Sequence, residues 1–262
     1  MASSNSAKGG WIESLKTVFW ALVIAGVFRT LFFQPFYIPS GSMKETLLIG
    51  DFLFVNKMAY GYSRWSCPFG LCPITGRVLG AEPERGDIVV FRHPVSGADF
   101  IKRVIGMPGD RVQMQGGILY LNDAPLPQEP AGLFTEVYER QGGAGGFPRC
   151  ENAPVAIGGD CTKSRFVETL PGGRDYFVLN IDDNGFADNT PVFTVPEGHF
   201  FFIGDNRDNS VDSRSPQNVG GVGMVPFDHL IGRANRVVFS AAGSSMLAFW
   251  TWRSDRFFHR LQ

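Results

Sequence analysis

The sequence predicts a mainly β protein: a β-rich core of antiparallel sheets, interrupted by an inserted smaller β/loop domain and preceded by one N-terminal transmembrane helix. Gly, Pro and Phe number 32, 17 and 24 among 262 residues, which is typical of many short strands and turns. Short apolar runs bounded by turn residues recur after residue 50. One membrane-grade apolar stretch lies near the N-terminus.

This apolar stretch runs from Thr17 to Phe33 and is interrupted by Arg29. Its uncharged part, Thr17–Phe28, has by itself the length of a signal-peptide core or a buried helix. Arg29 can extend its guanidinium toward the interface, so the apolar residues after it lengthen the stretch to about one span. We therefore expect a transmembrane anchor over residues 15–34, after a cytoplasmic segment of residues 1–14.

A cleaved signal peptide is the alternative. Lys8 and Lys16 resemble its positively charged start, and Ser40-Gly41-Ser42 resembles a small-x-small cleavage triplet. However, three bulky residues, 36–38, separate that triplet from the apolar core. We expect the helix to remain attached, with its N-terminus in the cytoplasm because the two lysines precede it.

The predicted core has two parts, residues 35–121 and 197–240, separated by an insertion. The core strands are expected in apolar runs at Phe52–Val55, Asp87–Phe91, Phe100–Ile105, Arg111–Met114, Ile118–Leu121, His199–Ile203, Leu230–Ile231 and Arg236–Phe239. The turn sequence Met107-Pro108-Gly109-Asp110 separates two of them.

Residues 122–196 form the expected inserted domain. Four Gly-Gly pairs punctuate a polar stretch that also holds the predicted strands Tyr176–Asn180 and Val192–Val195. Nothing in this segment indicates catalysis. The glycine pairs are equally consistent with flexible surface loops.

Four cysteines fall into two close pairs, Cys67/Cys72 and Cys150/Cys161. An even count in an exported domain indicates disulfides, and four cysteines allow three connectivities. The spacing of the second pair fits no common zinc site, and free thiols are the remaining alternative. We expect local pairing.

The segment 241–262 is expected to form an amphipathic tail. Its apolar residues recur at roughly helical spacing, while Arg253, Arg256 and Arg260 share another face. This pattern is typical of a helix lying in the membrane interface, and equally of a terminal helix docked on the domain. The apolar residues are Leu247, Trp250, Phe257, Phe258 and Leu261.

Charge and motif content limit the classes of function. The formal net charge of −1 offers no basic stripe for nucleic acid, so we expect none as a partner. No H-E-x-x-H motif supports a metalloprotease, and the acidic loop 204–214 does not match an EF-hand. We expect no metal and no cofactor.

Ser42 and Lys102 are the candidate catalytic residues. Ser42 lies in the run P-S-G-S-M-K-E-T-L shortly after the apolar stretch, outside any G-x-S-x-G elbow. A serine hydroxyl needs a nearby base to become nucleophilic. Within a strand, Lys102 shares a face with Phe100 and Val104, so burial would favour its neutral amine. A pKa lowered by about 2–3 units from 10.4 would let it act near neutral pH.

The polar loop Gly204–Arg214 is suited to fixing that lysine. Its closely spaced opposite charges favour internal ion pairs that stiffen the loop. The Ser210 hydroxyl is then a candidate to hydrogen-bond the Lys102 amine and orient it.

Four ordered motifs give the chain a resemblance to the bacterial type I signal peptidases (leader peptidases), which are Ser/Lys-dyad endopeptidases. They are P-S-G-S-M-K-E-T-L, R-G-D-I-V-V-F (85–91), F-I-K-R-V-I-G-M-P-G-D (100–110) and G-D-N-R-D-N-S-V-D-S-R (204–214). With the preceding apolar span, they cover most of the predicted core and little of the insertion.

The resemblance implies a role for individual residues. Ser42 would be the nucleophile and Lys102 the general base, and Ser210 would orient Lys102. The Ser40 hydroxyl and the Ser42 backbone N–H would form the oxyanion hole. The implied structural ion pairs are Asp205 with Arg103 and Asp212 with Arg214. The residues implied to line apolar pockets for the substrate are Phe36, Ile38, Met43, Leu47, Val90 and Ile101.

The same resemblance implies a substrate and a location. The partners would be preprotein signal peptides, cut after an Ala-x-Ala-like site while bound as an added strand, and membrane lipid. The chain would lie in the bacterial inner membrane as a single-pass protein with its catalytic domain on the periplasmic side. A membrane-anchored β-domain without proteolytic activity is the alternative, and a repressor-type Ser/Lys autoprotease is disfavoured by the span. Glu45 replaces a proline that the family often has.

Overall fold

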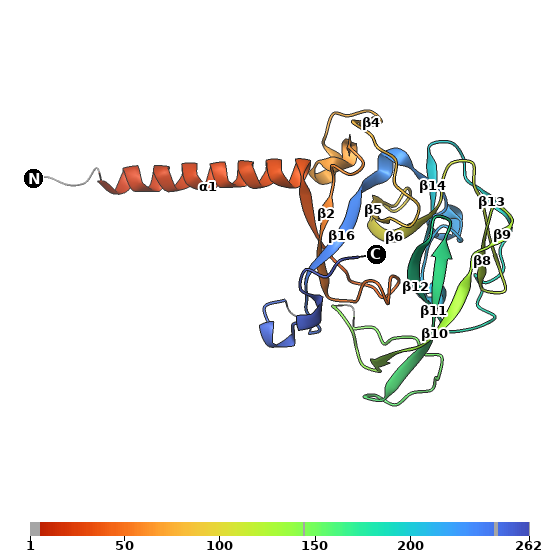
Figure 1. The fold of residues 1–262 in the computed structure, drawn as a ribbon. Coiled ribbons are helices and arrows are strands. Elements are labelled where there is room, and N and C mark those ends of the chain that lie inside the picture. Colours follow the sequence, from red (N-terminus) through yellow and green to blue (C-terminus); the bar gives the residue numbers. More distant parts are fainter. Residues whose placement is uncertain (1–5, 144, 244–245, 262) are drawn as a thin grey trace, which may run out of the picture.

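The computed structural model describes residues 6–143, 145–243 and 246–261. One long helix, α1 (Ser6–Leu31), projects from a β-rich domain formed by the rest of the chain (Figure 1). Its segment Gly10–Leu31 has a mean hydropathy of 1.5 and is long and apolar enough to cross a membrane. The structure confirms the predicted mainly β fold class with a single N-terminal apolar helix.

Helix α1 begins and ends before the bounds predicted for the anchor. Phe33 already starts β1 (Phe33–Tyr37), which pairs antiparallel with β2 (Asp51–Asn56). The Tyr62 hydroxyl donates to the Leu31 carbonyl at 2.8 Å, and the backbone N–H of Lys57 donates to Phe32 at 3.0 Å. Strand pairing therefore replaces helical bonding at the base of the helix.

The largest sheet has seven strands in the order β1-β2-β16-β5-β6-β14-β15, and all neighbours are antiparallel. Its edge strand β1 accommodates Pro35, whose nitrogen cannot donate to a ladder. The other strands of this sheet are β5 (Ile88–Arg92), β6 (Asp99–Gly106), β14 (His199–Ile203), β15 (Val225–Pro226) and β16 (Leu230–Ser240).

The seven-stranded sheet is buried on both faces. Val89 and Val90 follow each other in β5 and therefore point to opposite faces, where they join different apolar clusters. The cluster around Val90 includes Met43 and Leu47 from the loop between β1 and β2, which are both 0% exposed. This loop is consequently packed onto the sheet.

Two smaller sheets of three and four strands pack with the large one. A three-stranded sheet joins β10 (Gln128–Val137), β11 (Asp160–Leu170) and β12 (Arg174–Asn180), all from the segment expected to be inserted. A four-stranded sheet joins β7 (Arg111–Gln115), β8 (Ile118–Leu121), β9 (Ala124–Pro125) and β13 (Phe193–Thr194). Through β13, the end of that segment pairs with a strand of the first core part.

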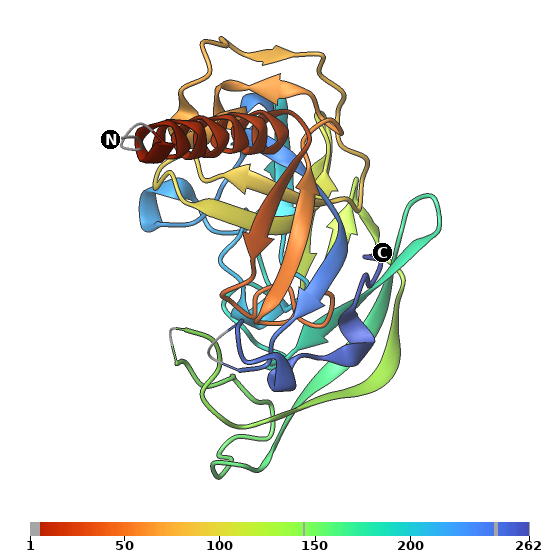
Figure 2. The ribbon, with the colours of Figure 1, turned by 90° about the vertical axis from the view of Figure 1, so that its left-hand side faces the viewer.

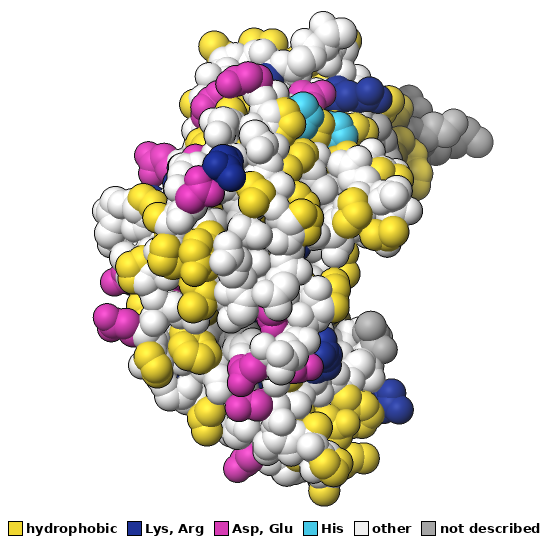
Figure 3. Space-filling view, turned by 90° about the vertical axis from the view of Figure 1, so that its right-hand side faces the viewer, with side chains coloured by type: hydrophobic (Ala, Val, Ile, Leu, Met, Phe, Trp, Pro, Cys, Tyr) yellow, Lys and Arg dark blue, Asp and Glu magenta, His cyan; other side chains and the backbone are white. Residues whose placement is uncertain are grey.

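A third apolar cluster, which includes Ile105, Leu119, Val178 and Phe201, draws residues from all three of these sheets. The β10–β11 hairpin extends beyond it at the bottom of Figures 1 and 2. The face of the domain turned away from α1 mixes apolar, acidic and a few basic side chains (Figure 3).

The remaining elements are short. Strands β3 (Tyr62–Ser63) and β4 (Arg77–Val78) form a two-stranded sheet. The 3₁₀-helices are η1 (Arg64–Ser66), η2 (Pro68–Gly70), η3 (Arg207–Asn209), η4 (Gln217–Val219), η5 (Phe227–His229), η6 (Phe249–Thr251) and η7 (Ser254–Arg256).

The tail does not form the helix that its spacing indicates. Within its described residues it contains only η6 and η7, and it docks on the domain through backbone bridges to β16 and the residue after it. Arg256 is buried and pairs with Asp51 at 2.5 Å, while Arg253 donates to the Ser240 hydroxyl at 2.6 Å. Two of the three arginines of the predicted basic face are thus turned toward the domain, where they satisfy acceptors, whereas Arg260 is exposed.

The cysteines form two disulfides, Cys67–Cys72 and Cys150–Cys161. The first closes the short turn around η2, and the second links the start of β11 to the loop before it. The structure thus joins the partners nearest in sequence.

Candidate active site

The loop between β1 and β2 carries Ser42. Its two ends are held together because the Ile38 N–H donates to the Asp51 carbonyl (2.9 Å) and the Gly50 N–H donates to Ile38 (3.0 Å). Gly50 has a φ of +95°, and a Cβ there would lie 1.9 Å from the carbonyl oxygen of Ala241. Glycine is therefore required at the base of the loop, which fixes where Ser42 is presented.

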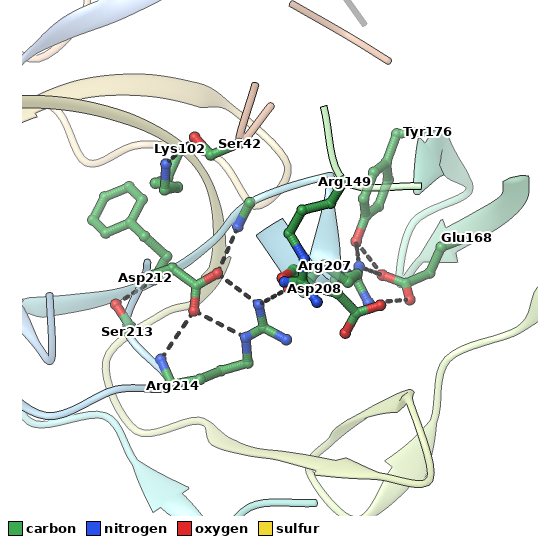
Figure 4. Close-up of polar contacts among 12 residues, drawn as sticks. Ser42, Lys102, Arg149, Glu168, Tyr176, Arg207, Asp208, Asp212, Ser213 and Arg214 are labelled. Atoms are coloured by element: carbon green, nitrogen blue, oxygen red, sulfur yellow. Dashed lines mark hydrogen bonds and ion pairs between the residues drawn. The ribbon is translucent and has the colours of Figure 1, made fainter. Parts of the chain in front are cut away.

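Lys102 reaches Ser42 from the middle of β6, where it pairs with Val89 of β5. The Lys102 Nζ and the Ser42 Oγ are 2.5 Å apart, a hydrogen-bond distance (Figure 4). Their exposed fractions are 3% and 7%. The structure thus brings together the two residues on which the sequence-based hypothesis depends.

Burial lowers the pKa of Lys102 to about 8, because desolvation penalises the ammonium. The carboxylates of Asp212 and Asp205 oppose this shift, and the guanidinium of Arg214 adds to it. The ring centroid of Phe100 lies 5.7 Å from the Nζ atom. A substantial neutral fraction of Lys102 is consequently present near pH 8.

Two donors lie near the Ser42 hydroxyl. The Ser40 hydroxyl is 3.5 Å from it, and Ser40 itself is exposed. Among the described residues, none accepts a hydrogen bond from the Ser42 backbone N–H. Both groups implied for an oxyanion hole are therefore available at the same end of the cleft.

The loop after β14 forms hydrogen bonds directly with the backbone at Ser42. The Asn206 backbone N–H donates to the Ser42 carbonyl at 3.1 Å, and its side-chain amide donates to the Gly41 carbonyl at 2.9 Å. A Cβ on Gly204 would lie 2.6 Å from the Ser42 carbonyl oxygen and 2.2 Å from the Ser210 hydroxyl. The chain thus approaches too closely here for any side chain. Sequence reasoning missed the role of Asn206, although it lies inside the quoted motif.

The ion pairs expected in this loop form, and both are buried. Arg103 pairs with Asp205 through two contacts of 2.9 and 2.8 Å. Arg214 pairs with Asp212 at 2.9 Å, and the same carboxylate accepts from the backbone N–H of Gly204 at 3.1 Å (Figure 4). Burial alone would raise the pKa of Asp212, but the Arg214 charge and these hydrogen bonds lower it.

Ser210 does not make the contact expected of it. Its hydroxyl is buried against Gly204 and makes no hydrogen bond with Lys102; it lies instead near the Asp212 carboxylate and helps to lower the pKa of that group. Orientation of Lys102 by Ser210 stays a prediction.

An apolar cleft of about 340 Å³ opens beside the dyad. Four of the six expected pocket residues line it, namely Phe36, Ile38, Val90 and Ile101. The other two, Met43 and Leu47, lie beneath it in the core and support it instead. Lining residues that sequence reasoning missed are Tyr37, Pro39, Asp99, Phe100, Asn209 and Val211.

A further buried network joins this loop to β11 and β12. Arg207 pairs with Glu168 at 2.6 Å and donates to the Tyr176 hydroxyl at 3.2 Å (Figure 4). Arg207 belongs to the same motif as Asp205, whereas its partners lie in the inserted segment and gave no sequence signal. Among the described residues, no group of three or more His, Cys, Asp or Glu side chains is arranged to hold a metal ion.

Comparison with known proteins assigns the chain to a family of peptidases. The family model described as "Signal peptidase, peptidase S26" matches residues 11–239, and the chain belongs to this family. Signal peptidase I of Rickettsia typhi is 41% identical over 231 residues, which cover 84% of this chain and 77% of that protein. Signal peptidase I of Rickettsia akari is 37% identical over 250 residues, with coverages of 90% and 84%.

A solved structure of a signal peptidase I from Enterococcus faecalis is 26% identical to this chain. It covers 58% of this chain and 97% of that one, with a TM-score of 0.30.

Proposed function

We propose that the protein is a membrane-anchored serine endopeptidase that removes signal peptides from exported preproteins by cleaving after an Ala-x-Ala-like site. The observation that carries this proposal is the 2.5 Å approach of Lys102 Nζ to Ser42 Oγ in an apolar cleft. Membership of the signal peptidase family supports the substrate class.

In the proposed reaction, neutral Lys102 accepts the Ser42 proton as Oγ attacks the carbonyl carbon of the scissile peptide. The ammonium then gives that proton to the leaving amine, and an acyl ester remains on Ser42. Lys102, neutral again, removes a proton from a water molecule that attacks the ester. The resulting ammonium returns a proton to Ser42 Oγ as the ester bond breaks, which releases the signal peptide and restores both side chains. The proton transfers in this scheme take place among Ser42, Lys102, the substrate and water.

The negative charge that forms on the carbonyl oxygen would be stabilised by the Ser40 hydroxyl and the Ser42 backbone N–H. A single such donor contributes about 3–4 kcal/mol in a comparable protease. The exposure of Ser40 leaves its hydroxyl free to turn toward the oxygen when a substrate fills the cleft.

The cleft supports a preference for small side chains before the cut. Its walls carry Phe36 and Ile38 on one side and Ile101 on the other, and Val90 lies among them. Residues 36–37 of β1 and 99–102 of β6 line the cleft and supply extended backbone to which a substrate strand can hydrogen-bond. Small apolar side chains fit this narrow space, while main-chain bonds hold the substrate irrespective of sequence.

The proposed location is the bacterial inner membrane, with the catalytic domain on the periplasmic side. Helix α1 supplies one span, and the two disulfides suit an oxidising compartment. The tail lies on the side of the domain from which α1 projects (Figure 2), and its Phe249 and Trp250 are 69% and 76% exposed. These aromatic side chains suit the membrane interface.

The test uses the full-length protein in detergent with a preprotein that carries an Ala-x-Ala site. We expect cleavage after the final Ala by the wild type and no cleavage by Ser42→Ala or Lys102→Met. Arg111→Gln serves as a control, because it alters an exposed ion pair away from the cleft. Intact preprotein with the wild type, under conditions in which a known signal peptidase cuts it, would favour the anchored binding domain.

A further inference from the structure

A largely buried carboxylate, whose side chain is 11% exposed, links the nucleophile loop (residues 38–50, between β1 and β2) to the β10–β11 hairpin. Glu136 of β10 accepts from Lys44 at 2.5 Å through one oxygen and from Lys163 of β11 through the other. Lys44 is 4% exposed and Lys163 is 1% exposed. Gln141 closes the cluster, because it accepts from Lys44 Nζ (2.7 Å) and donates to Glu136 (2.7 Å).

The stem of Lys44 passes across the backbone next to the nucleophile. A Cβ on Gly41 would lie 3.1 Å from Lys44 Cε and 3.3 Å from its Cδ, so the lysine fills the space beside this glycine. The Gly41 carbonyl also accepts from the Lys44 N–H (3.2 Å) and the Asn206 side chain (2.9 Å). Gly41 connects Ser40 to Ser42, so its peptide units set the direction of both.

Two more contacts connect the same parts of the chain. Glu45 accepts from Arg165 of β11 at 3.0 Å. A Cβ on Gly142 would lie 2.8 Å from Ile49 and 3.5 Å from the Pro39 carbonyl, so the turn after β10 rests on the nucleophile loop. Figures 1 and 2 both show the turn and the loop side by side.

The cost of burying these charges indicates that the cluster fixes the geometry of the loop and does not mainly stabilise the fold. Two lysines and one carboxylate have been taken out of water, and buried ion pairs often stabilise a fold no better than apolar residues of equal volume. Burial lowers the pKa of Lys44 although Glu136 opposes the shift. Because its ammonium is held by Glu136, the methylene chain of Lys44 has a fixed position. That chain packs beside the Gly41 backbone and so fixes its position too.

We propose that Lys44 is a positioning residue for the cleavage reaction: anchored on Glu136 of the β10–β11 hairpin, it holds the Ser40–Ser42 backbone in the geometry that directs the nucleophile and the oxyanion donors. This rests on the proposed function. It assigns to the hairpin a part in catalysis without contact with substrate.

The experiment compares Lys44→Met with Lys163→Met in the full-length enzyme. Both substitutions remove one lysine from the same Glu136 carboxylate, but only Lys44 touches Gly41. We expect Lys44→Met to lower kcat on the order of ten- to a hundredfold with KM little changed, since small misplacements of reacting groups cost that much. We expect both substitutions to lower the melting temperature by similar amounts. In Lys163→Met, however, we expect kcat to stay within about threefold of wild type.

Two further variants test the same idea. Lys44→Arg keeps the charge and the stem, so we expect it to recover most of kcat. Glu136→Gln keeps one acceptor and tests the anchor if Lys44→Met does not fold, with an expected loss of kcat and unchanged KM. The midpoint of the pH profile should be the same in all variants, because Lys44 is not among the groups that perturb Lys102.

Equal kcat values for Lys44→Met and Lys163→Met would overturn the positioning role, as would a loss of kcat in Glu136→Gln that matches only a loss of folded protein. Failure of the proposed function would look different, because the wild type itself would then leave the preprotein intact.

Discussion

Lys102 combines two properties that a solvated lysine does not have, a neutral fraction near pH 8 and a fixed distance to a hydroxyl. Both come from its place in the middle of β6, where neighbouring strands exclude water. The first property follows from a local pattern, since Phe100 and Val104 share its face. The distance from Lys102 to Ser42 depends on how β1, β6 and the loop after β14 assemble. It therefore cannot be predicted from a local sequence pattern.

The rate of cleavage should depend on pH through this one amine. The general base must be neutral, so activity falls on the side where Lys102 is protonated, below its pKa of about 8. We expect kcat/KM to rise about tenfold per pH unit from pH 6 to 7 and to level off above about pH 8. Initial rates across pH 6–10 measure this, and a limb near the ordinary lysine pKa of 10.5 would contradict it.

Burial of Lys102 should also weaken the fold. Its pKa is lowered in the folded state, so the unfolded chain binds the proton more tightly between about pH 8 and 10.5. Stability therefore rises with pH through that window, and the full penalty, about 3 kcal/mol, applies below it. Lys102→Met removes the penalty.

We expect Lys102→Met to unfold at higher denaturant concentration than wild type at pH 7, with a difference that shrinks toward pH 10.5. Equilibrium denaturation at both pH values measures the difference. If Lys102→Met is inactive but no more stable than wild type at pH 7, then other interactions in the wild type must offset the cost of burying the Lys102 amine. Ser42→Ala is the control, because it abolishes activity without removing a buried charge.

The strands are the elements that the sequence predicts best. Alternating or continuous apolar runs with turn residues at their ends mark β2, β5, β6, β7, β8 and β14, and all form near their expected positions. The long hairpin β10–β11 has mostly exposed or half-buried residues, so it lacks such a signal. The contacts between it and the nucleophile loop join residues about a hundred positions apart, which local patterns do not encode.

The tail shows why helical spacing alone misleads. Three arginines at matching intervals predict one polar face, yet in the structure Arg256 lies inside the domain on Asp51, 205 positions away. A buried carboxylate needs a cation, and this requirement outweighs a weak helical preference. The apolar residues between the arginines are then left exposed.

Arg256→Met should destabilise the domain, because it leaves the Asp51 carboxylate buried without its partner. We expect a loss of about 3–5 kcal/mol in the free energy of unfolding, as is found when one member of a buried pair is removed. Denaturant titration checks this against Arg111→Gln, whose exposed pair with Asp123 should cost less than about 1 kcal/mol. Similar losses in the two variants would mean that the tail is only loosely docked.

At the scale of the whole molecule, the apolar helix and the exposed aromatic residues of the tail lie on one side of the domain (Figures 1 and 2). The apolar span could be predicted from the sequence. The placement of the tail could not, because it depends on the ion pair between Arg256 and the distant Asp51. This common side is the one we expect to face the bilayer, which would hold the domain at two places.

Trp250 provides a test in the intact protein. In vesicles that contain brominated lipids, we expect Trp250→Phe to reduce the fraction of tryptophan fluorescence that the lipids quench, because the ring would sit at the interface. Trp65→Phe is the matched change, since Trp65 is half-buried beside His229. An unchanged quenched fraction in Trp250→Phe would mean that the tail stays in water.

The junction between α1 and the domain is short and hydrogen-bonded. The helix ends at Leu31 and passes at once into the five residues of β1, with hydrogen bonds from Tyr62 and Lys57 securing the junction. No flexible linker separates the span from Ser42, and a strand of five residues extends only about 17 Å. If α1 crosses the bilayer as proposed, we expect the Ser42 hydroxyl to stand at a set height above the lipid. The elevation of a peptide bond above the bilayer would then select it for cleavage as much as the side chains beside it.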